Sequence, residues 1–447
     1  MFFIGLVIVA CLLYIWDYKI LALVCFFFFL TSGFNLIPEK IMDIGPISKG
    51  FDFAFFIMAG ILLIDSLCIK NYLRIDNFIK YLLVFGGFLG ICIIYSKWVV
   101  GLDWAGILRT CRYQFFWLAY FIFRNLDKKR LEAILRVLFP IVVALSVLYL
   151  LQIVLGTHIL NKMAKSTFWI GGLSIPRYYN QPDMLQFFTL LAIYHNPYKN
   201  VLKKITTFIL ICALLGAFHR SLMSLFPLML LLGYIIRLSR MRRILLLSVL
   251  GFIVLCGISV TGVLFVQSRM YADLRNIVSG NFADVEMTLD PEDLAESTFT
   301  FRMAVLYERN QYVSERPVVM VLGAGLVAED SKIIDKLFDF KIGLPDEATG
   351  KVEQIESGDI SFSSLILRLG YFGTALYLML WVYLGVFFYK NRENKYGFVS
   401  FLYVVMSICV AFFSGNLLSP VNYIILLITY VIIKKTNQEQ EVPQLAM

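Results

Sequence analysis

Apolar runs long enough to cross a membrane recur along almost the whole of this 447-residue chain. Most are close to the roughly 17–25 residues that an α-helix needs to span a bilayer core. Only 16% of the residues are charged, whereas a soluble domain carries about a quarter. The sequence therefore predicts an all-α, polytopic integral membrane protein with 12 or 13 transmembrane helices, because the first and seventh runs are short. The predicted spans are residues 2–16, 20–38, 51–69, 81–99, 105–123, 137–156, 184–196, 202–218, 221–236, 244–267, 370–389, 397–414 and 420–433.

The distribution of positive charge predicts the orientation of these spans. Short basic segments are separated from one another by two spans each, so all of them fall on one side of the membrane. Lys and Arg are enriched in cytoplasmic loops, which makes that side, and the C-terminus, cytoplasmic. The net charge of +9 therefore reflects topology, and nucleic acid is not an expected partner. The basic segments are residues 70–80, 124–136, 197–204, 237–243 and 390–395, with Lys434 and Lys435 in the tail.

One long polar segment interrupts the pattern. Residues 268–360 contain 9 Lys and Arg but 18 Asp and Glu, a net charge of −9. Long loops are translocated largely regardless of charge, so this segment is predicted to lie outside the cytoplasm. The chain has only 3 His and no Cys/His cluster, so neither a metal nor another cofactor is expected. The predicted organisation is N-terminal spans at 1–267, an extracytoplasmic loop at 268–369, C-terminal spans at 370–434 and a cytoplasmic tail at 435–447.

Three arginines follow one another at seven-residue spacing in this loop: Arg302, Arg309 and Arg316. On a helix this spacing places them along one face, with a drift of about 20° per step. None has an acidic residue at i±3 or i±4, so the helix is not expected to supply their counter-charge. Pro317 disfavours helical geometry in the residue before it, which predicts that the helix ends near Glu315.

Further cations are predicted to lie on the same side of the membrane as the loop. Ionisable residues at membrane depth are rare and mark function by default. Arginine offers a planar, permanently charged fork for two phosphate oxygens. Together these residues predict a lipid-linked phosphate or pyrophosphate as the ligand. They are Arg177 before the seventh span, His219 and Arg220 at the tip of a tight hairpin, Arg109 and Arg112 just inside the fifth span, and Arg368 at the start of a late span.

Structural roles are alternatives for several members of this set. Arg109 and Arg112 can pair with carboxylates of neighbouring helices, and Arg220 can extend to lipid headgroups. His219 suits the end of a hairpin as well as a site. At least one of the three loop arginines is expected to be a partner of the many acidic residues of the loop.

Four motifs, in order over residues 170–380, resemble those of the O-antigen ligase and polymerase superfamily of bacterial membrane glycosyltransferases. The first, in which Arg177 and Asp183 occur, enters a span; the second is a hairpin tip. The third combines the three arginines with a Pro and a Gly-x-Gly, and the fourth leads into a late span. They read "RYYNQPDML", "FHRSL", "FRMAVLYERNQYVSERPVVMVLGAG" and "DISFSSLILRLGYFG".

The resemblance implies transfer of a glycan from undecaprenyl pyrophosphate at the outer face of the bacterial inner membrane, with a periplasmic loop and no metal or nucleotide sugar. By position, Arg220 and Arg302 would hold the pyrophosphate. Asp359 stands where ligase-like members have a His, and it becomes the candidate base; Arg368 stands where an acid is common. The expected substrate-binding residues are Arg109, Arg112, Arg177, His219, Arg309, Arg316 and Arg368.

The expected function is therefore a polymerase that joins lipid-linked repeat units of a surface polysaccharide. A ligase that passes finished glycan to another acceptor, such as a lipid A core, is the nearest alternative. A flippase for the same lipid-linked sugars is an alternative of another class. The expected partners are the undecaprenyl-pyrophosphate-linked oligosaccharide, the lipid bilayer, and other proteins of polysaccharide export and chain-length control.

Overall fold

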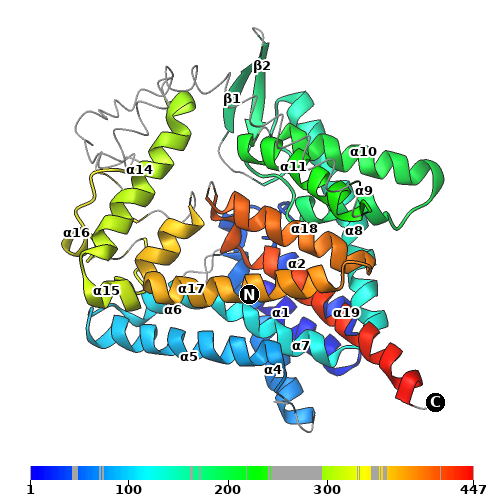
Figure 1. Cartoon of the computed structure of the whole chain (residues 1–447), viewed down its shortest axis with the longest axis horizontal. Coiled ribbons are helices and arrows are strands. Elements are labelled where there is room, and N and C mark those ends of the chain that lie inside the picture. Colours follow the sequence, from blue (N-terminus) through cyan, green and yellow to red (C-terminus); the bar gives the residue numbers. More distant parts are fainter. Residues whose placement is uncertain are drawn as a thin grey trace.

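The described part of the chain in this computed structural model is mostly helical (Figure 1). The predicted span 244–267 and much of the loop after it lie outside the described residues. Residues 2–42, 49–69, 72, 75–161, 165–170, 173–217, 219–239, 242, 294–329, 331, 333–343, 352, 354–355, 360–412 and 414–445 are described.

Most predicted spans in this part coincide with one helix or with consecutive helical segments, but the helix in the predicted span 20–38 ends at Leu30 and residues 31–36 form turns. The first half of the bundle contains α1 (Phe2–Ile15), α2 (Lys19–Leu30), α3 (Glu39–Met42), α4 (Gly50–Cys68), α5 (Asn77–Trp98), α6 (Trp104–Phe115), η1 (Phe116–Leu118), α7 (Ala119–Asn125), α8 (Lys128–Leu155), α9 (Leu185–His195), α10 (Asn200–Gly216) and α11 (Arg220–Arg237). The second contains α14 (Leu294–Ser314), α15 (Pro317–Leu322), α16 (Ile334–Leu337), α17 (Ser361–Lys390), α18 (Lys395–Val410), η3 (Gly415–Leu417) and α19 (Pro420–Leu445).

Within the described residues, four helices are long and apolar enough to cross a membrane: α4, α5, α8 and α17. Helices α1, α2, α9 and α18 and part of α11 are apolar but shorter. The predicted fifth span is divided, because the 3-10 turn η1 separates α6 from α7. The apolar composition thus gives helices that are compatible with a membrane protein.

Aspartates begin three of these helices. The side chains of Asp76, Asp103 and Asp127 each accept a hydrogen bond from the backbone N–H three residues later, at the starts of α5, α6 and α8. This is the N-cap interaction, which satisfies one of the donors that a helix start leaves free. The caps set where the apolar helices begin.

Aromatic side chains fill the centre of the bundle, where the N-terminal and C-terminal helices meet. Trp117 stacks on Tyr423 of α19, with ring centroids 4.1 Å apart and planes 6° apart. Trp381 of α17 packs edge-on against Trp117, and Tyr377 donates a hydrogen bond of 2.8 Å to the carbonyl of Leu417. Large rings buried in this way contribute much of the apolar area of a core.

Two elements differ from the predicted all-α pattern. Strands β1 (Lys165–Ile170) and β2 (Leu173–Tyr178) form an antiparallel hairpin after α8. The Tyr149 hydroxyl at the end of α8 donates a hydrogen bond of 2.8 Å to the carbonyl of Tyr178, which joins the hairpin to the bundle.

Helix α17 is broken near its start, as the glycine in the late-span motif permits. Gly370 has φ 68° and ψ −177°, so residues 361–369 form a short helix before the long one. The break lies against α15: a Cβ at Gly370 would lie 2.6 Å from the carbonyl oxygen of Met320. Gly323, with φ 75°, would meet the backbone of Arg368 in the same way. Glycine is required here by both backbone conformation and space.

Candidate functional site

A pocket lies between α14, the start of α17 and the segment that joins them. Helix α14 contributes Arg302, Val305 and Arg309, which lie on one face at a spacing of three and four residues. Residues Gly343 and Gln354 come from the connecting segment. The first two turns of α17 present a second face with the same spacing, which consists of Ile360, Ser363, Ser364 and Leu367.

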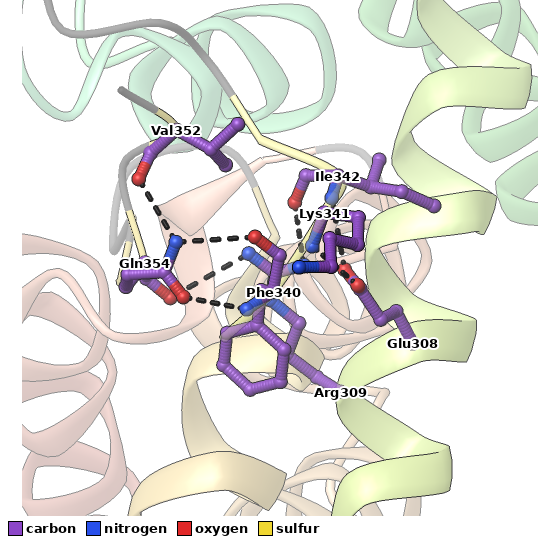
Figure 2. A network of polar contacts seen from close by, with 7 residues as sticks. All are labelled: Glu308, Arg309, Phe340, Lys341, Ile342, Val352 and Gln354. Atoms are coloured by element: carbon purple, nitrogen blue, oxygen red, sulfur yellow. Dashed lines mark hydrogen bonds and ion pairs between the residues drawn. The ribbon is translucent and has the colours of Figure 1, made fainter. Parts of the chain in front are cut away.

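Arg309 fixes the wall of this pocket (Figure 2). Its Nη1 donates to the Glu308 carboxylate at 2.5 Å and to the carbonyl of Ile342 at 2.6 Å. Its guanidinium lies over the ring of Phe340, 4.1 Å from the centroid. The Gln354 amide bonds both the N–H and the carbonyl of Phe340. With its side chain only 4% exposed, Arg309 holds Phe340, Ile342 and Gln354 against α14.

The expectation that α14 would leave its arginines without local counter-charge is wrong for two of the three. Arg309 pairs with Glu308, and Arg316 lies 3.9 Å from Glu315. The i±3 and i±4 rule concerns residues stacked on one face. Long side chains at adjacent positions can instead bend toward each other, and the backbone at 341–342 draws Glu308 toward Arg309 by donating to its carboxylate.

The positive charge of Arg302 acts on His219, as does that of Arg177 from a third element. Burial disfavours the charged form of His219, and the positive charges of Arg177 and Arg302 disfavour it further, so the pKa of His219 is lowered to about 4. Arg177 is anchored there because its Nε donates to the carbonyl of Ala217 at 3.3 Å. The charges of Arg177 on β2 and Arg302 on α14 thus both act on the imidazole that precedes α11. At neutral pH the imidazole of His219 is neutral.

Arg368 lies beside the same pocket through its contact with Ser364. Its Nη1 donates to the Ser364 hydroxyl at 3.1 Å, and its Nε donates to the carbonyl of Val327 at 3.2 Å. The carboxylate of Glu329 is 3.9 Å from its Nη2. These contacts make Arg368 a residue that fixes the first turns of α17, where an acid was the residue expected by resemblance.

The remaining predicted cations lie in other surroundings. Arg112 forms an ion pair of 2.5 Å with Asp52 of α4, which is the structural alternative considered for it. Arg109 is exposed. Arg316 is also exposed; it lies over the ring of Tyr312 and donates to the carbonyl of that residue at 2.9 Å, at the end of α14.

Two residues expected to be catalytic cannot be placed in the site. Arg220 begins α11, but its side chain is outside the described part of the structure. Asp359 lies outside the described residues altogether.

Sequence reasoning missed the polar residues of the pocket and underrated one acid. Ser363, Ser364 and Gln354 carry no motif of their own, although the repeated serines of "SFSS" at the start of an apolar span were a visible signal.

Burial raises the pKa of Asp183 to about 7, even though Asn35 donates to its carboxylate at 3.5 Å. The nearby Met184 has φ 61°, a strained conformation for a residue that is not glycine.

Among the described residues, no group of three or more His, Cys, Asp or Glu is arranged to hold a metal ion. The residues that line the pocket include two arginines, two serine hydroxyls and one amide among apolar side chains. Groups of this kind bind anions and sugar oxygens. No family model matches this chain, and no curated protein sequence matches it.

Proposed function

We propose that this chain is a polymerase of the bacterial inner membrane that joins undecaprenyl-pyrophosphate-linked oligosaccharide units into a surface polysaccharide. The proposal rests on one observation: Arg302 lines a pocket and, with Arg177, acts electrostatically on His219, although the three residues come from different elements. Several cations held near one point suit an anion with more than one charge. A diphosphate attached to a lipid is such an anion. The four sequence motifs support the same reading.

In the proposed reaction an acceptor hydroxyl oxygen forms a bond to the anomeric carbon of the donor glycan. The bond from that carbon to the diphosphate breaks, and the lipid diphosphate leaves. Arg302 would stabilise the negative charge that develops on the departing diphosphate. Arg177 would add to this stabilisation, and Arg220 is the second arginine that the motifs imply for the same role. The hydroxyl proton passes to a base, for which Asp359 is the candidate that position suggests.

The position of the site favours an enzyme over a flippase for the same lipid. His219 precedes the first residue of α11, Arg177 is near the end of β2, and Ser363 is in the first turn of α17. A transporter would need polar groups along a path through the middle of its apolar helices. These three residues lie instead near the ends of elements, and Arg302 lies in α14, which is not one of the apolar helices.

Purified protein in lipid nanodiscs with a synthetic lipid-linked repeat unit tests the proposal. Wild-type protein should release lipid diphosphate and form dimers and longer oligomers of the unit. Arg302→Ala should reduce turnover by on the order of a hundredfold or more, the usual loss when a preorganised charge donor is removed. Arg136→Ala, which removes an exposed arginine of α8, is the matched control. Turnover unchanged in Arg302→Ala would reject the assigned site.

The ligase alternative differs in the acceptor, so a deletion strain separates the two. Loss of a polymerase should leave surface caps with a single repeat unit. Loss of a ligase should instead leave free polymer on the lipid carrier.

A further inference from the structure

A second group of cations acts on His195, the last residue of α9. The positive charges of Arg237, Lys395 and Lys203 all act on its imidazole. Arg237 is the last residue of α11, Lys395 is the first of α18, and Lys203 lies in the first turn of α10. We call His195 and these three cations the basic cluster. It draws on three segments that the sequence predicts on one side of the membrane, residues 197–204, 237–243 and 390–395.

Aromatic rings fix the guanidinium of Arg237 in this cluster. The guanidinium carbon lies 4.3 Å from the ring centroid of Phe398 in α18 and 4.8 Å from that of Tyr194 in α9. The Nη2 atom of Arg237 is 3.1 Å from Nε2 of His195. Helix α9 packs against both α10 and α18, and α18 packs against α11 (Figure 1). The charge of Arg237 is therefore held in place, although the residue remains exposed.

The described part of the chain supplies no counter-ion to these three cations. Lys203 and Lys395 are exposed and, like Arg237, form no ion pair with a described residue. The Nζ atom of Lys395 lies over the ring of Tyr396, 4.6 Å from its centroid. Basic residues at the cytoplasmic ends of helices are expected from topology alone. Positive charges that act on one imidazole also repel one another, however, and an anion would offset that repulsion.

Apolar side chains next to the basic cluster are exposed. On α10, Leu202 is 58% exposed, Ile205 49% and Phe208 68%, at a spacing of three residues. On α11, Tyr234 precedes Arg237 by three residues and is 58% exposed. Cations at helix ends beside apolar side chains on the same helices suit a ligand with a negative headgroup and acyl chains. Basic sites between helices on the cytoplasmic side of a membrane bind anionic lipid headgroups in this way.

We propose that the basic cluster binds the headgroup of an anionic phospholipid in the leaflet on its own side of the membrane. Arg237, Lys203 and Lys395 pair with the headgroup phosphate, and the acyl chains lie along the apolar side chains of α10 and α11. The polymerase site is predicted on the other side of the membrane. This lipid site therefore goes beyond the proposed function and does not depend on it.

Native mass spectrometry of the full-length protein, delipidated in detergent, tests this proposal. The protein is titrated with phosphatidylglycerol, cardiolipin and phosphatidylcholine that carry the same acyl chains, and inorganic phosphate is added as a competitor. The test variant combines Arg237→Gln, Lys203→Gln and Lys395→Gln. Arg237→Lys, a separate variant, keeps the charge.

The matched control removes the same amount of charge elsewhere. It combines Lys80→Gln in α5 with Lys128→Gln and Lys129→Gln in α8, on the same predicted side of the membrane. The thermal midpoint of every variant in the same detergent shows whether it is folded. If the triple test variant does not fold, the single exposed change Lys203→Gln takes its place.

One cation near an anionic headgroup is worth about fivefold in affinity. The triple test variant should therefore bind phosphatidylglycerol and cardiolipin on the order of a hundredfold more weakly than wild type does, and Lys203→Gln about fivefold more weakly. The control and Arg237→Lys should keep most of the wild-type affinity. Wild type should bind both anionic lipids more tightly than phosphatidylcholine, and inorganic phosphate should not displace them.

Equal affinity of wild type for phosphatidylglycerol and phosphatidylcholine would overturn the proposal. Wild-type affinity in the test variant would do the same. An equal loss in the control would show a general effect of surface charge and would reject a site at the basic cluster. Displacement of the lipid by inorganic phosphate would show that any anion suffices, and would reject the lipid as the ligand.

Discussion

Arg309 and Glu308 are adjacent in the sequence, and their side chains form an ion pair with Nη1 and Oε2 2.5 Å apart. The pair is largely buried: the arginine side chain is 4% exposed and the glutamate 19%. Glu308 also accepts hydrogen bonds from the backbone N–H groups of Lys341 and Ile342. The pair therefore joins α14 to the segment that closes one side of the pocket.

Removal of one partner of this pair should destabilise the protein strongly. Arg309→Ala leaves a buried carboxylate without its counter-ion, a change that costs about 3–5 kcal/mol in comparable buried pairs. Thermal unfolding in detergent, followed by intrinsic fluorescence, should show a clearly lower midpoint. The control is Lys341→Ala in the same segment, whose pair with Asp339 is 74% and 88% exposed. Exposed pairs contribute about 0–1 kcal/mol, so equal midpoints for the two variants would contradict this reading.

The break in α17 should depend on Gly370 because of space as well as backbone conformation. Gly370 has φ 68° and ψ −177°, a conformation that is almost restricted to glycine and costs other residues about 1–3 kcal/mol. In Gly370→Ala the new Cβ would also lie 2.6 Å from the carbonyl of Met320, so the loss should be larger and the yield of folded protein low. Gly101→Ala separates the cost of the backbone conformation from the cost of the steric clash. Gly101 has φ 81°, but a new Cβ there would have no atom within 4 Å. The yield of folded protein in size-exclusion chromatography and the thermal midpoint are measured for both variants. Equal losses in Gly370→Ala and Gly101→Ala would contradict a role for the close packing at Gly370.

His219 should make the protein less stable in acid. Its pKa is about 4 in the folded protein, against 6.5 for the ordinary group. The unfolded chain therefore binds more protons between these pH values, and stability falls as pH decreases from about 6.5 to 4. His219→Gln should reduce this loss, as measured by the thermal midpoint at intervals between pH 7 and 4.5. His158→Gln, in another segment, is the control. If His219→Gln showed the same pH dependence as wild type, the His219 imidazole would not be the group that titrates between pH 7 and 4.5.

Asp183 should have the opposite effect. Its pKa is raised to about 7 by burial, against an ordinary 3.8, so the folded protein binds more protons between these values. The contribution of Asp183 to the free energy of unfolding therefore rises as pH falls from about 7 to 4. It therefore offsets part of the loss caused by His219, and wild-type protein should show a shallow pH dependence.

Asp183→Asn removes the offset. Asparagine carries no charge to bury, so the variant should be at least as stable as wild type at pH 8 and lose stability more steeply on acidification. The same midpoint series measures it. A parallel shift at all pH values would mean that the introduced amide disturbs the contact with Asn35 and that titration of Asp183 is not the cause.

The helices could be predicted from the sequence because length and apolar composition are local signals. The hairpin at 165–178 was missed, although "KSTFWI" and "LSIPRY" flank Gly171 and Gly172, a two-residue turn signal between β-prone segments. Its apolar residues were too few to stand out beside the long apolar runs. The late span was predicted to begin at residue 370, and α17 is broken at Gly370, where its long helix begins.

The site was less accessible to sequence reasoning because it depends on tertiary contacts. The action of Arg177 and Arg302 on His219 depends on how three elements are arranged in space, and the sequence predicted only that the three residues lie on one side of the membrane. The role of Arg309 was hidden because its partners, Ile342 and Gln354, lie more than 30 residues away. The general expectation that one loop arginine pairs with an acid of the loop is confirmed by Arg309.

Arg316 should be dispensable, in contrast to Arg302 on the same helix. Its side chain is 48% exposed, and its contacts are to Glu315 at 3.9 Å and to the carbonyl of Tyr312 at the end of α14. Exposed contacts of this kind contribute about 0–1 kcal/mol. Arg316→Ala should therefore retain turnover within about twofold of wild type in the nanodisc assay and lower the thermal midpoint only slightly, whereas Arg302→Ala loses turnover. Equal loss in both variants would show that the seven-residue spacing of the arginines, rather than the pocket, defines the site.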